Sequence, residues 1–189
     1  MKWYFVRHGE IESNIRKVYA GWSEEGLTEN GIQQAGDAGL NLKDCAVDAI
    51  YCSPLNRTIQ TAEIIGDILN KKPILDESFK ELRLGVWEGL SEEIVARNYP
   101  REWEIWNTRP ADLILEGRET LHELLERVLD GIKRIQHKFD WKNVVVVTHV
   151  AIIRVLLLYV QNLDLNLYKT IPVPKNGKVF EINGNILCK

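Results

Sequence analysis

The chain has 189 residues, of which 45% are hydrophobic and 27% are charged, and this balance suits one globular domain with a full-sized core. A formal net charge of −3 without a long basic stripe argues against a nucleic-acid-binding protein. The three cysteines form no CxxC pair, so we expect neither a disulfide framework nor a structural zinc site. The reducing cytoplasm is the expected location.

The apolar stretches do not indicate export or membrane insertion. The run at the N-terminus ends at once at Arg7 and His8, so we expect no signal peptide. The longest apolar stretch, residues 144–160, is interrupted by His149 and Arg154. We therefore expect a buried strand and a buried helix there, and no contact with a membrane.

The first third of the chain predicts two strands and two helices. Residues 3–6 are an apolar run long enough for a buried strand and too short for a helix. Thr28 is the expected N-cap of the first amphipathic helix. Residues 46–52 predict a second core strand. Ser53-Pro54 then predicts the start of a helix, with Ser53 as its N-cap.

A helical insertion is predicted at about residues 90–118, where it would form a lid. It holds Trp103 and Trp106, which suit a substrate pocket and a small packed core equally well, so both interpretations stay open. Thr120 and Glu123 then form a capping box, T-x-x-E. This box opens the most clearly amphipathic helix of the chain.

The last third of the chain predicts a central strand, a helix and a hairpin. Four consecutive valines at 144–147 are typical of a parallel strand that is buried on both faces, and residues 150–160 predict the helix after it. Residues 178–182 and 185–188 predict a C-terminal hairpin at the sheet edge. Because strands alternate with helices, we expect an α/β fold, a three-layer α/β/α sandwich with a mostly parallel central sheet, as one domain over residues 1–189.

Basic and imidazole side chains follow three of the predicted strands. The first strand ends at Arg7 and His8, the valine strand ends at His149, and Arg57 lies one turn into the helix after the second strand. Because the carboxyl ends of parallel strands meet at one edge of a sheet, we expect these side chains to converge. Guanidinium groups bind phosphate oxygens in pairs, and an imidazole can attack phosphorus. The sequence therefore predicts a phosphate pocket that supports phosphoryl transfer to a histidine.

Such a transfer leaves an alkoxide that needs a proton. Glu81 lies in a loop just before Gly85 and is the expected general acid. No cluster of residues has the spacing of metal ligands, so we expect no metal ion. The arginines would then supply the charge stabilisation that metals supply elsewhere.

A longer series of motifs runs in order along the chain: Arg7-His8-Gly9-Glu10, Asn14, Gly21-Trp22, Leu27-Thr28, Gly31, Gln34-Ala35, Ser53-Pro54-Leu55, Arg57-Thr58, Gln60-Thr61-Ala62, Glu81, Gly85, Trp87-Glu88-Gly89 and Thr148-His149. This series resembles the histidine phosphatase superfamily, the phosphoglycerate-mutase-like group. Within that group the chain is most similar to small phosphatases, which include the α-ribazole phosphatases.

The resemblance implies a role for each matched residue. His8 would be the nucleophile that forms a phosphohistidine, and Glu81 would protonate the leaving group and later deprotonate water. Arg7, Arg57 and His149 would complete the catalytic set. Substrate would be bound by Arg7, Asn14, Gly21, Trp22, Arg57 and His149. No cofactor is implied, and the partner implied is a small phosphorylated substrate.

One position departs from the family pattern. The family commonly has a glycine after its second histidine, whereas His149 is followed by Val150. A side chain at this position would crowd the phosphate without removing the backbone N–H that faces it.

Three functions fit these residues. The first is a metal-independent phosphomonoesterase acting on a small phosphorylated metabolite such as α-ribazole 5'-phosphate. The second is phosphoryl transfer of the phosphoglycerate mutase type, and the third is a non-catalytic protein that binds a phospho-ligand. The catalytic positions are filled, which disfavours the third. The short chain, and Glu92 where a mutase would be expected to carry a lysine, favour the first over the second.

Overall fold

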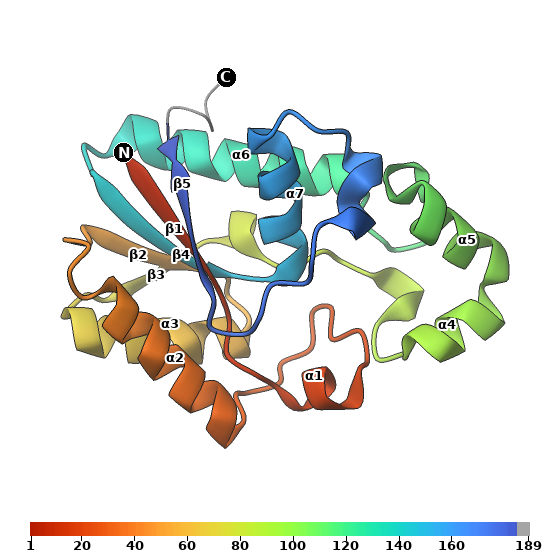
Figure 1. Ribbon diagram of the computed structural model, residues 1–189, viewed down its shortest axis with the longest axis horizontal. Helices are drawn as coiled ribbons and strands as arrows, with labels where there is room; N and C mark the ends of the chain where they lie inside the picture. The colour runs from red at the N-terminus through yellow and green to blue at the C-terminus, as the bar shows by residue number, and fades with distance from the viewer. Residues whose placement is uncertain (185–189) are drawn as a thin grey trace.

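The structure is a computed structural model that describes residues 1–184 (Figure 1). Its strands are β1 (Lys2–Arg7), β2 (Ala49–Cys52), β3 (Pro73–Leu75), β4 (Asn143–Thr148) and β5 (Val179–Asn183). Within the described residues they form one sheet in the order β3-β2-β4-β1-β5. The first four strands are parallel, and β5 is antiparallel to β1 at the edge. The predicted mostly parallel sheet is confirmed.

The register of the central strands brings their carboxyl ends level. Val6 of β1 and Cys52 of β2 both pair with Val147 of β4. The segments that follow these strands therefore start at the same edge of the sheet. His8 and His149 leave it beside each other, with ring centroids 5.3 Å apart.

Helices cover both faces of the sheet, as Figure 1 shows. The long helices are α2 (Glu29–Leu42), α3 (Asn56–Leu69), α6 (Leu121–Lys138) and α7 (Val150–Val160). Val145 and Val147 pack into the core under α2 and α3, whereas Val144 and Val146 pack into the core under α6 and α7. Because successive side chains of a strand point to opposite faces, the valine run supplies both cores. This is the predicted three-layer α/β/α sandwich.

Short helices lie beyond the carboxyl ends of the strands (Figure 1). They are α1 (Glu12–Arg16), α4 (Glu92–Asn98), α5 (Pro100–Thr108) and the 3₁₀ turns η1 (Glu77–Phe79), η2 (Gly85–Trp87), η3 (Pro110–Asp112) and η4 (Leu165–Thr170). The insertion predicted at about residues 90–118 thus contains α4, α5 and η3. Together these short elements surround the edge at which the central strands end.

Helix starts were predicted with mixed success. Thr28 caps α2 through its hydroxyl, and Thr120 forms the predicted capping box at the start of α6. The N-cap predicted at Ser53 is wrong: Leu55 is the N-cap of α3, and the Ser53 hydroxyl bonds to the ring of His149 instead. The first arm of the predicted C-terminal hairpin is β5, and the second arm, residues 185–188, lies outside the described residues.

Candidate active site

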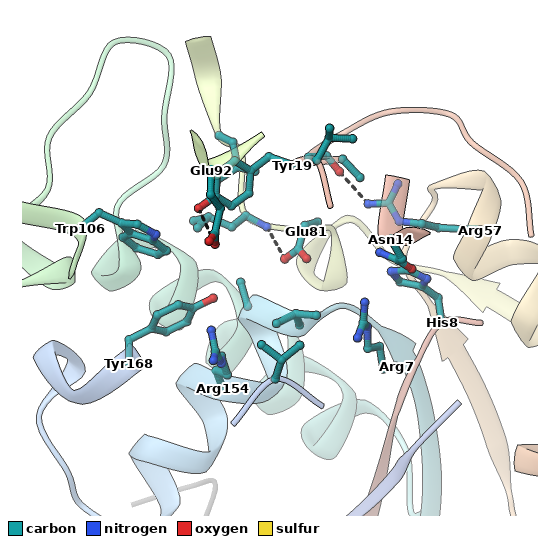
Figure 2. A pocket seen from close by; sticks show the side chains of 18 of the residues that line it. Arg7, His8, Asn14, Tyr19, Arg57, Glu81, Glu92, Trp106, Arg154 and Tyr168 are labelled. Carbon is teal, nitrogen blue, oxygen red and sulfur yellow. Dashed lines mark hydrogen bonds between the residues drawn. The ribbon is translucent and has the colours of Figure 1, made fainter. Parts of the chain in front are cut away.

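A cavity of about 200 Å³ opens at the carboxyl edge of the sheet (Figure 2). Six of the eight residues expected at the site line it, namely Arg7, His8, Asn14, Gly21, Arg57 and Glu81. His149 lies behind His8 with no exposed surface, and Trp22 lines a different groove. The segments after β1 and β2 and the loop before α4 therefore meet in one place.

His8 is presented as a neutral imidazole. Its backbone N–H donates to the Thr148 carbonyl at 3.0 Å, which continues the pairing of β1 with β4. Its Nδ1 lies 2.7 Å from the Gly9 carbonyl oxygen, which can only accept, so Nδ1 carries the proton and Nε2 keeps its lone pair. Burial, together with the charges of Arg57 and Arg7, holds the pKa of His8 well below its usual range. Such a ring can attack an electrophilic phosphorus.

Two buried arginines place positive charge around His8, and neither forms an ion pair with a carboxylate among residues 1–184. The backbone holds them in place: Arg7 Nη1 donates to Pro174 O, and Arg57 donates to Ser23 O at 2.8 Å and Gly21 O at 2.6 Å. The Nε of each arginine is buried without a partner in residues 1–184. Burial lowers the pKa of Arg7 to about 10, so it stays cationic at neutral pH. Buried unpaired donors of this kind suit a dianion such as a phosphoryl group.

Asn14 is oriented by a residue that the sequence did not indicate. Asn176 donates its side-chain N–H groups to the His8 carbonyl at 3.0 Å and to Asn14 Oδ1 at 2.9 Å. Oδ1 of Asn14 also accepts from the Ile11 N–H at 3.2 Å. With this oxygen bonded twice, the amide NH₂ of Asn14 is the group left for a ligand in the cavity.

Glu81 lies between the two ends of the cavity, as Figure 2 shows. Its Oε1 accepts from the Leu82 N–H at 2.8 Å. Burial raises the pKa of its carboxyl, although the Leu82 bond, Arg57 and Arg7 act in the opposite direction. A carboxyl group whose pKa is raised in this way is better suited to donate a proton to an oxygen that leaves phosphorus.

The segment that carries Glu81 is fixed from behind by α6. Arg127 donates Nη1 to Ser78 O and Lys80 O, both at 2.9 Å, and pairs with both carboxylate oxygens of Glu119 at 2.7 Å. This bidentate pair is the strong form of an arginine–carboxylate contact. The acid is therefore held on a rigid support.

Trp22 belongs to the same support and not to the cavity. Its Nε1 donates to the Glu81 carbonyl at 2.8 Å, and its ring lies on the far side of this segment, under Lys80 Nζ at 4.0 Å. Because Trp22 does not line this cavity, its predicted role in binding substrate stays a prediction, and its contact with the site is the bond to the Glu81 backbone. Gly21, its neighbour, does line the cavity and holds Arg57.

His149 is the N-cap residue of α7 and has its ring bonded to Ser53, with Nε2 at 2.8 Å from Oγ. Its Nδ1 is buried without a partner among the described residues. Burial and the nearby Arg57 hold the pKa of His149 well below its usual range. Val150, the residue that replaces the family's glycine, lines the cavity together with Ala151.

The end of the cavity away from His8 is built from residues that the sequence did not place at the site, apart from Trp106, for which a pocket role was left open. They are Tyr19, Glu92, Trp106, Arg154, Tyr168 and Lys169. Arg154 follows Val150 by one helical turn, so the periodicity of α7 was the signal for it. Of the two tryptophans in the insertion, Trp106 lines the cavity and Trp103 does not, and both also pack against Trp87.

Within residues 1–184, no group of three or more histidine, cysteine, aspartate or glutamate side chains is placed to hold a metal ion. The helices of the same residues include none long and apolar enough to cross a bilayer.

The sequence profile of the histidine phosphatase superfamily (branch 1) matches residues 3–185. The chain therefore belongs to this superfamily, and it is an enzyme of the phosphatase and phosphoglycerate mutase-like class.

Relatives of known sequence agree with this class. The chain is 33% identical to the uncharacterized phosphatase PhoE of Bacillus subtilis, over 87% of this chain and 80% of that protein. It is 31% identical to phosphoserine phosphatase 1 of Hydrogenobacter thermophilus, over 88% and 79%. It is 30% identical to the probable phosphoglycerate mutase GpmB of Erwinia tasmaniensis, over 86% and 76%.

Solved structures share the fold. YhfR of Bacillus stearothermophilus superposes with a TM-score of 0.90 at 26% identity, over 96% of this chain and 90% of that one. The α-ribazole phosphatase of Shigella flexneri superposes with a TM-score of 0.85 at 22% identity, over 97% and 90%. At that level of identity the second likeness concerns the fold alone.

Proposed function

We propose that the protein is a metal-independent phosphomonoesterase that acts through a phosphohistidine at His8. The observation that carries this proposal is the arrangement of three groups along one cavity. His8, whose pKa is lowered, lies beside Arg7 and Arg57, whose Nε atoms have no partner among residues 1–184. Glu81, whose pKa burial raises, lines the same cavity.

The groups support a two-step reaction. In the first step, Nε2 of His8 forms a bond to phosphorus while the ester P–O bond breaks, and Glu81 gives its proton to the departing alkoxide. In the second step, Glu81 takes a proton from water, the water oxygen attacks the phosphohistidine, and His8 leaves with its electron pair. Arg7, Arg57 and the buried Nδ1–H of His149 would donate to the phosphoryl oxygens throughout.

Phosphoryl transfer of the mutase type is the second candidate, favoured by the identity to GpmB. Glu92 disfavours it, because this carboxylate lines the far end of the cavity together with Arg154 and Lys169, so that end is not purely cationic, as an anionic phosphoglycerate would favour. A non-catalytic binding role is disfavoured by the complete set of reactive groups. The fold that the chain shares with an α-ribazole phosphatase is the support for α-ribazole 5'-phosphate as the substrate. This compound is therefore one candidate among small phosphorylated metabolites.

The test is to trap the intermediate. When turnover of p-nitrophenyl phosphate is stopped with alkali, in which a phosphohistidine is stable, we expect mass spectrometry to detect a phosphoenzyme that acid then hydrolyses. This signal should disappear in His8→Ala together with phosphate release. His137→Ala, which changes an exposed histidine on α6, should keep both signals. Transfer from a bisphosphate primer to 3-phosphoglycerate without release of phosphate would instead identify a mutase. Turnover by His8→Ala would overturn the proposal.

A further inference from the structure

The far end of the cavity carries charges of both signs that do not neutralise each other. Glu92 comes from α4, Arg154 from α7 and Lys169 from η4, and all three line the cavity. Among the ion pairs of residues 1–184, none joins Glu92 to either cation within 4.0 Å. Charges that share a cavity but do not pair are available to a ligand.

The two cations are fixed by aromatic rings and the backbone. Lys169 Nζ lies 5.4 Å over the ring of Trp103 and 5.3 Å over that of Trp106. Burial lowers the pKa of Lys169, and the negative charge of Glu92 opposes this effect. The two charges therefore interact electrostatically across the cavity. Such preorganised cations lose little entropy when they bind an anion.

Arg154 provides the more deeply buried of these charges. Its side chain is 9% exposed, and Figure 2 shows its guanidinium directed into the cavity below Tyr168. One Nη donates to the Ile171 carbonyl, and the guanidinium carbon lies 4.9 Å over the Tyr168 ring. Its Nε is buried without a partner in the described part of the chain. A buried guanidinium that forms no ion pair among residues 1–184 suits an anionic ligand group.

Glu92 faces these cations from the opposite wall. Its carboxylate accepts one hydrogen bond, from the Tyr19 hydroxyl at 3.3 Å, which leaves most of its acceptor capacity open. Figure 2 shows Glu92 and Tyr19 above the cavity and Arg154 below it. A purely anionic leaving group would meet the cations but also this carboxylate, and a purely cationic one would meet the reverse conflict.

We propose that the leaving group is a small zwitterion, an alcohol that bears both an ammonium and a carboxylate, so that the substrate is a phosphorylated hydroxy amino acid. Glu92 binds the ammonium, and Arg154 with Lys169 binds the carboxylate. This assignment rests on the proposed phosphomonoesterase function, because it places the ester oxygen next to Glu81, between the arginines around His8 and the charged end. The aromatic rings around Lys169 then support a cation and do not serve as a stacking platform.

A set of four matched substrates tests the assignment. O-phosphoserine carries both charged groups, 3-phosphoglycerate replaces the ammonium by a hydroxyl, O-phosphoethanolamine lacks the carboxylate, and ethyl phosphate lacks both. We expect kcat/KM for O-phosphoserine to exceed that for each singly charged analogue by about tenfold, the range of one charge-assisted hydrogen bond. Ethyl phosphate should be the poorest of the four.

Substitutions assign each charge to its partner. Glu92→Gln should lower the ratio of kcat/KM for O-phosphoserine over 3-phosphoglycerate by about tenfold. Lys169→Met should lower the ratio for O-phosphoserine over O-phosphoethanolamine by about the same factor. Glu104→Gln makes the same charge change as Glu92→Gln on the exposed side of α5, so it should leave both ratios unchanged.

The outcomes separate this inference from the proposed function. Hydrolysis of all four esters at equal efficiency, or an unchanged O-phosphoserine to 3-phosphoglycerate ratio in Glu92→Gln, would overturn the zwitterion and leave the phosphatase intact. Failure of the wild-type enzyme to hydrolyse any ester, p-nitrophenyl phosphate included, would overturn both.

Discussion

Ser53 and His149 are joined side chain to side chain, with Oγ 2.8 Å from Nε2, although 96 residues separate them in the sequence. Ser53 Oγ also accepts from the Leu55 N–H at 3.4 Å, so its own proton is free to be donated to the ring. A ring that accepts at Nε2 carries its proton on Nδ1, which is the buried atom without a partner. We infer that Ser53 donates to Nε2 and so selects the tautomer in which His149 is a donor through Nδ1.

Removing this hydroxyl should weaken the site without unfolding the protein. In Ser53→Ala, the imidazole loses its fixed tautomer, and we expect kcat/KM for p-nitrophenyl phosphate to fall about tenfold or more, as for other residues that orient a ligating histidine. Inhibition by vanadate, which mimics a five-coordinate phosphorus, should weaken in parallel. Steady-state kinetics and vanadate titration measure both effects.

A direct measurement of the His149 tautomer separates an orienting role of Ser53 from a packing role. Nitrogen-15 NMR of the His149 ring should show a protonated Nδ1 in the wild type and a mixture of tautomers in Ser53→Ala. Ser53→Cys keeps a weak donor and should recover part of the activity. An unchanged tautomer in Ser53→Ala would assign the serine a packing role only.

The assembly of the site was predictable because it depends on strand ends. The apolar runs before His8 and His149 mark two strands, and parallel strands bring their carboxyl ends to one edge. The N-cap predicted at Ser53 was wrong because a short motif does not encode tertiary partners. A Ser-Pro pair looks the same whether the hydroxyl caps the next helix or bonds to an imidazole, and only the fold shows that α7 starts beside β2.

The charged end of the cavity was not predictable for a related reason. Arg154, Lys169 and Glu92 come from three elements that share no spacing in the sequence. The periodicity of α7 could indicate Arg154 alone, but not that Glu92 and Lys169 lie opposite it, because their common position follows from how α4 and η4 cross the edge of the sheet.

Glu81 should matter in proportion to how poor the leaving group is. Glu81→Gln cannot donate a proton, so hydrolysis of ethyl phosphate should fall by about 10²–10⁴-fold, the usual contribution of general acid catalysis. The loss with p-nitrophenyl phosphate should be much smaller, because nitrophenolate leaves without a proton. Comparison of kcat for the two substrates is the measurement, and equal losses would indicate that another group is the acid.

Activity should depend on pH through the titration of His8 and Glu81. Burial and the arginines lower the pKa of His8, so the neutral nucleophile persists below pH 6.5, and the rate falls only at more acidic pH. Burial raises the pKa of Glu81 above 4.5, so the rate with ethyl phosphate should fall as pH rises through that higher value. A pH profile of kcat/KM tests both limbs, and the basic limb should vanish in Glu81→Gln.

The free energy of unfolding should fall at acidic pH because His8 and His149 are buried in their neutral forms. Burial lowers the folded pKa of both His8 and His149 below the unfolded value of 6.5, so the unfolded chain binds protons first. Their contribution is fully present above pH 6.5 and is lost as pH falls from there through the folded pKa values. Melting temperatures between pH 8 and pH 5 should show this decline. His149→Asn should flatten it, and a slope as steep as in the wild type would contradict the assignment.

Removal of metal ions should leave the enzyme active. The positive charge around His8 comes from Arg7 and Arg57, so the proposed chemistry has no step for a cation. Turnover of p-nitrophenyl phosphate after dialysis against EDTA should equal that of the untreated protein. Loss of activity that a divalent cation restores would refute a metal-independent mechanism.

Gly9 allows the segment after β1 to pack closely against α2. A Cβ on Gly9 would lie 2.2 Å from the carbonyl oxygen of Gly31 in α2, and a backbone atom cannot give way to it. We expect Gly9→Ala to lower the free energy of unfolding by about 1–3 kcal/mol, the cost of overpacking, and to displace His8 so that activity falls as well. Gly36→Ala is the matched control, because it lies in the same helix with nothing within 4 Å of its Cβ, and it should stabilise the protein by about 0.4–1 kcal/mol. Urea denaturation of both variants measures the two effects. If Gly9→Ala were as stable as the wild type, the segment after β1 and α2 could separate to admit a Cβ without cost.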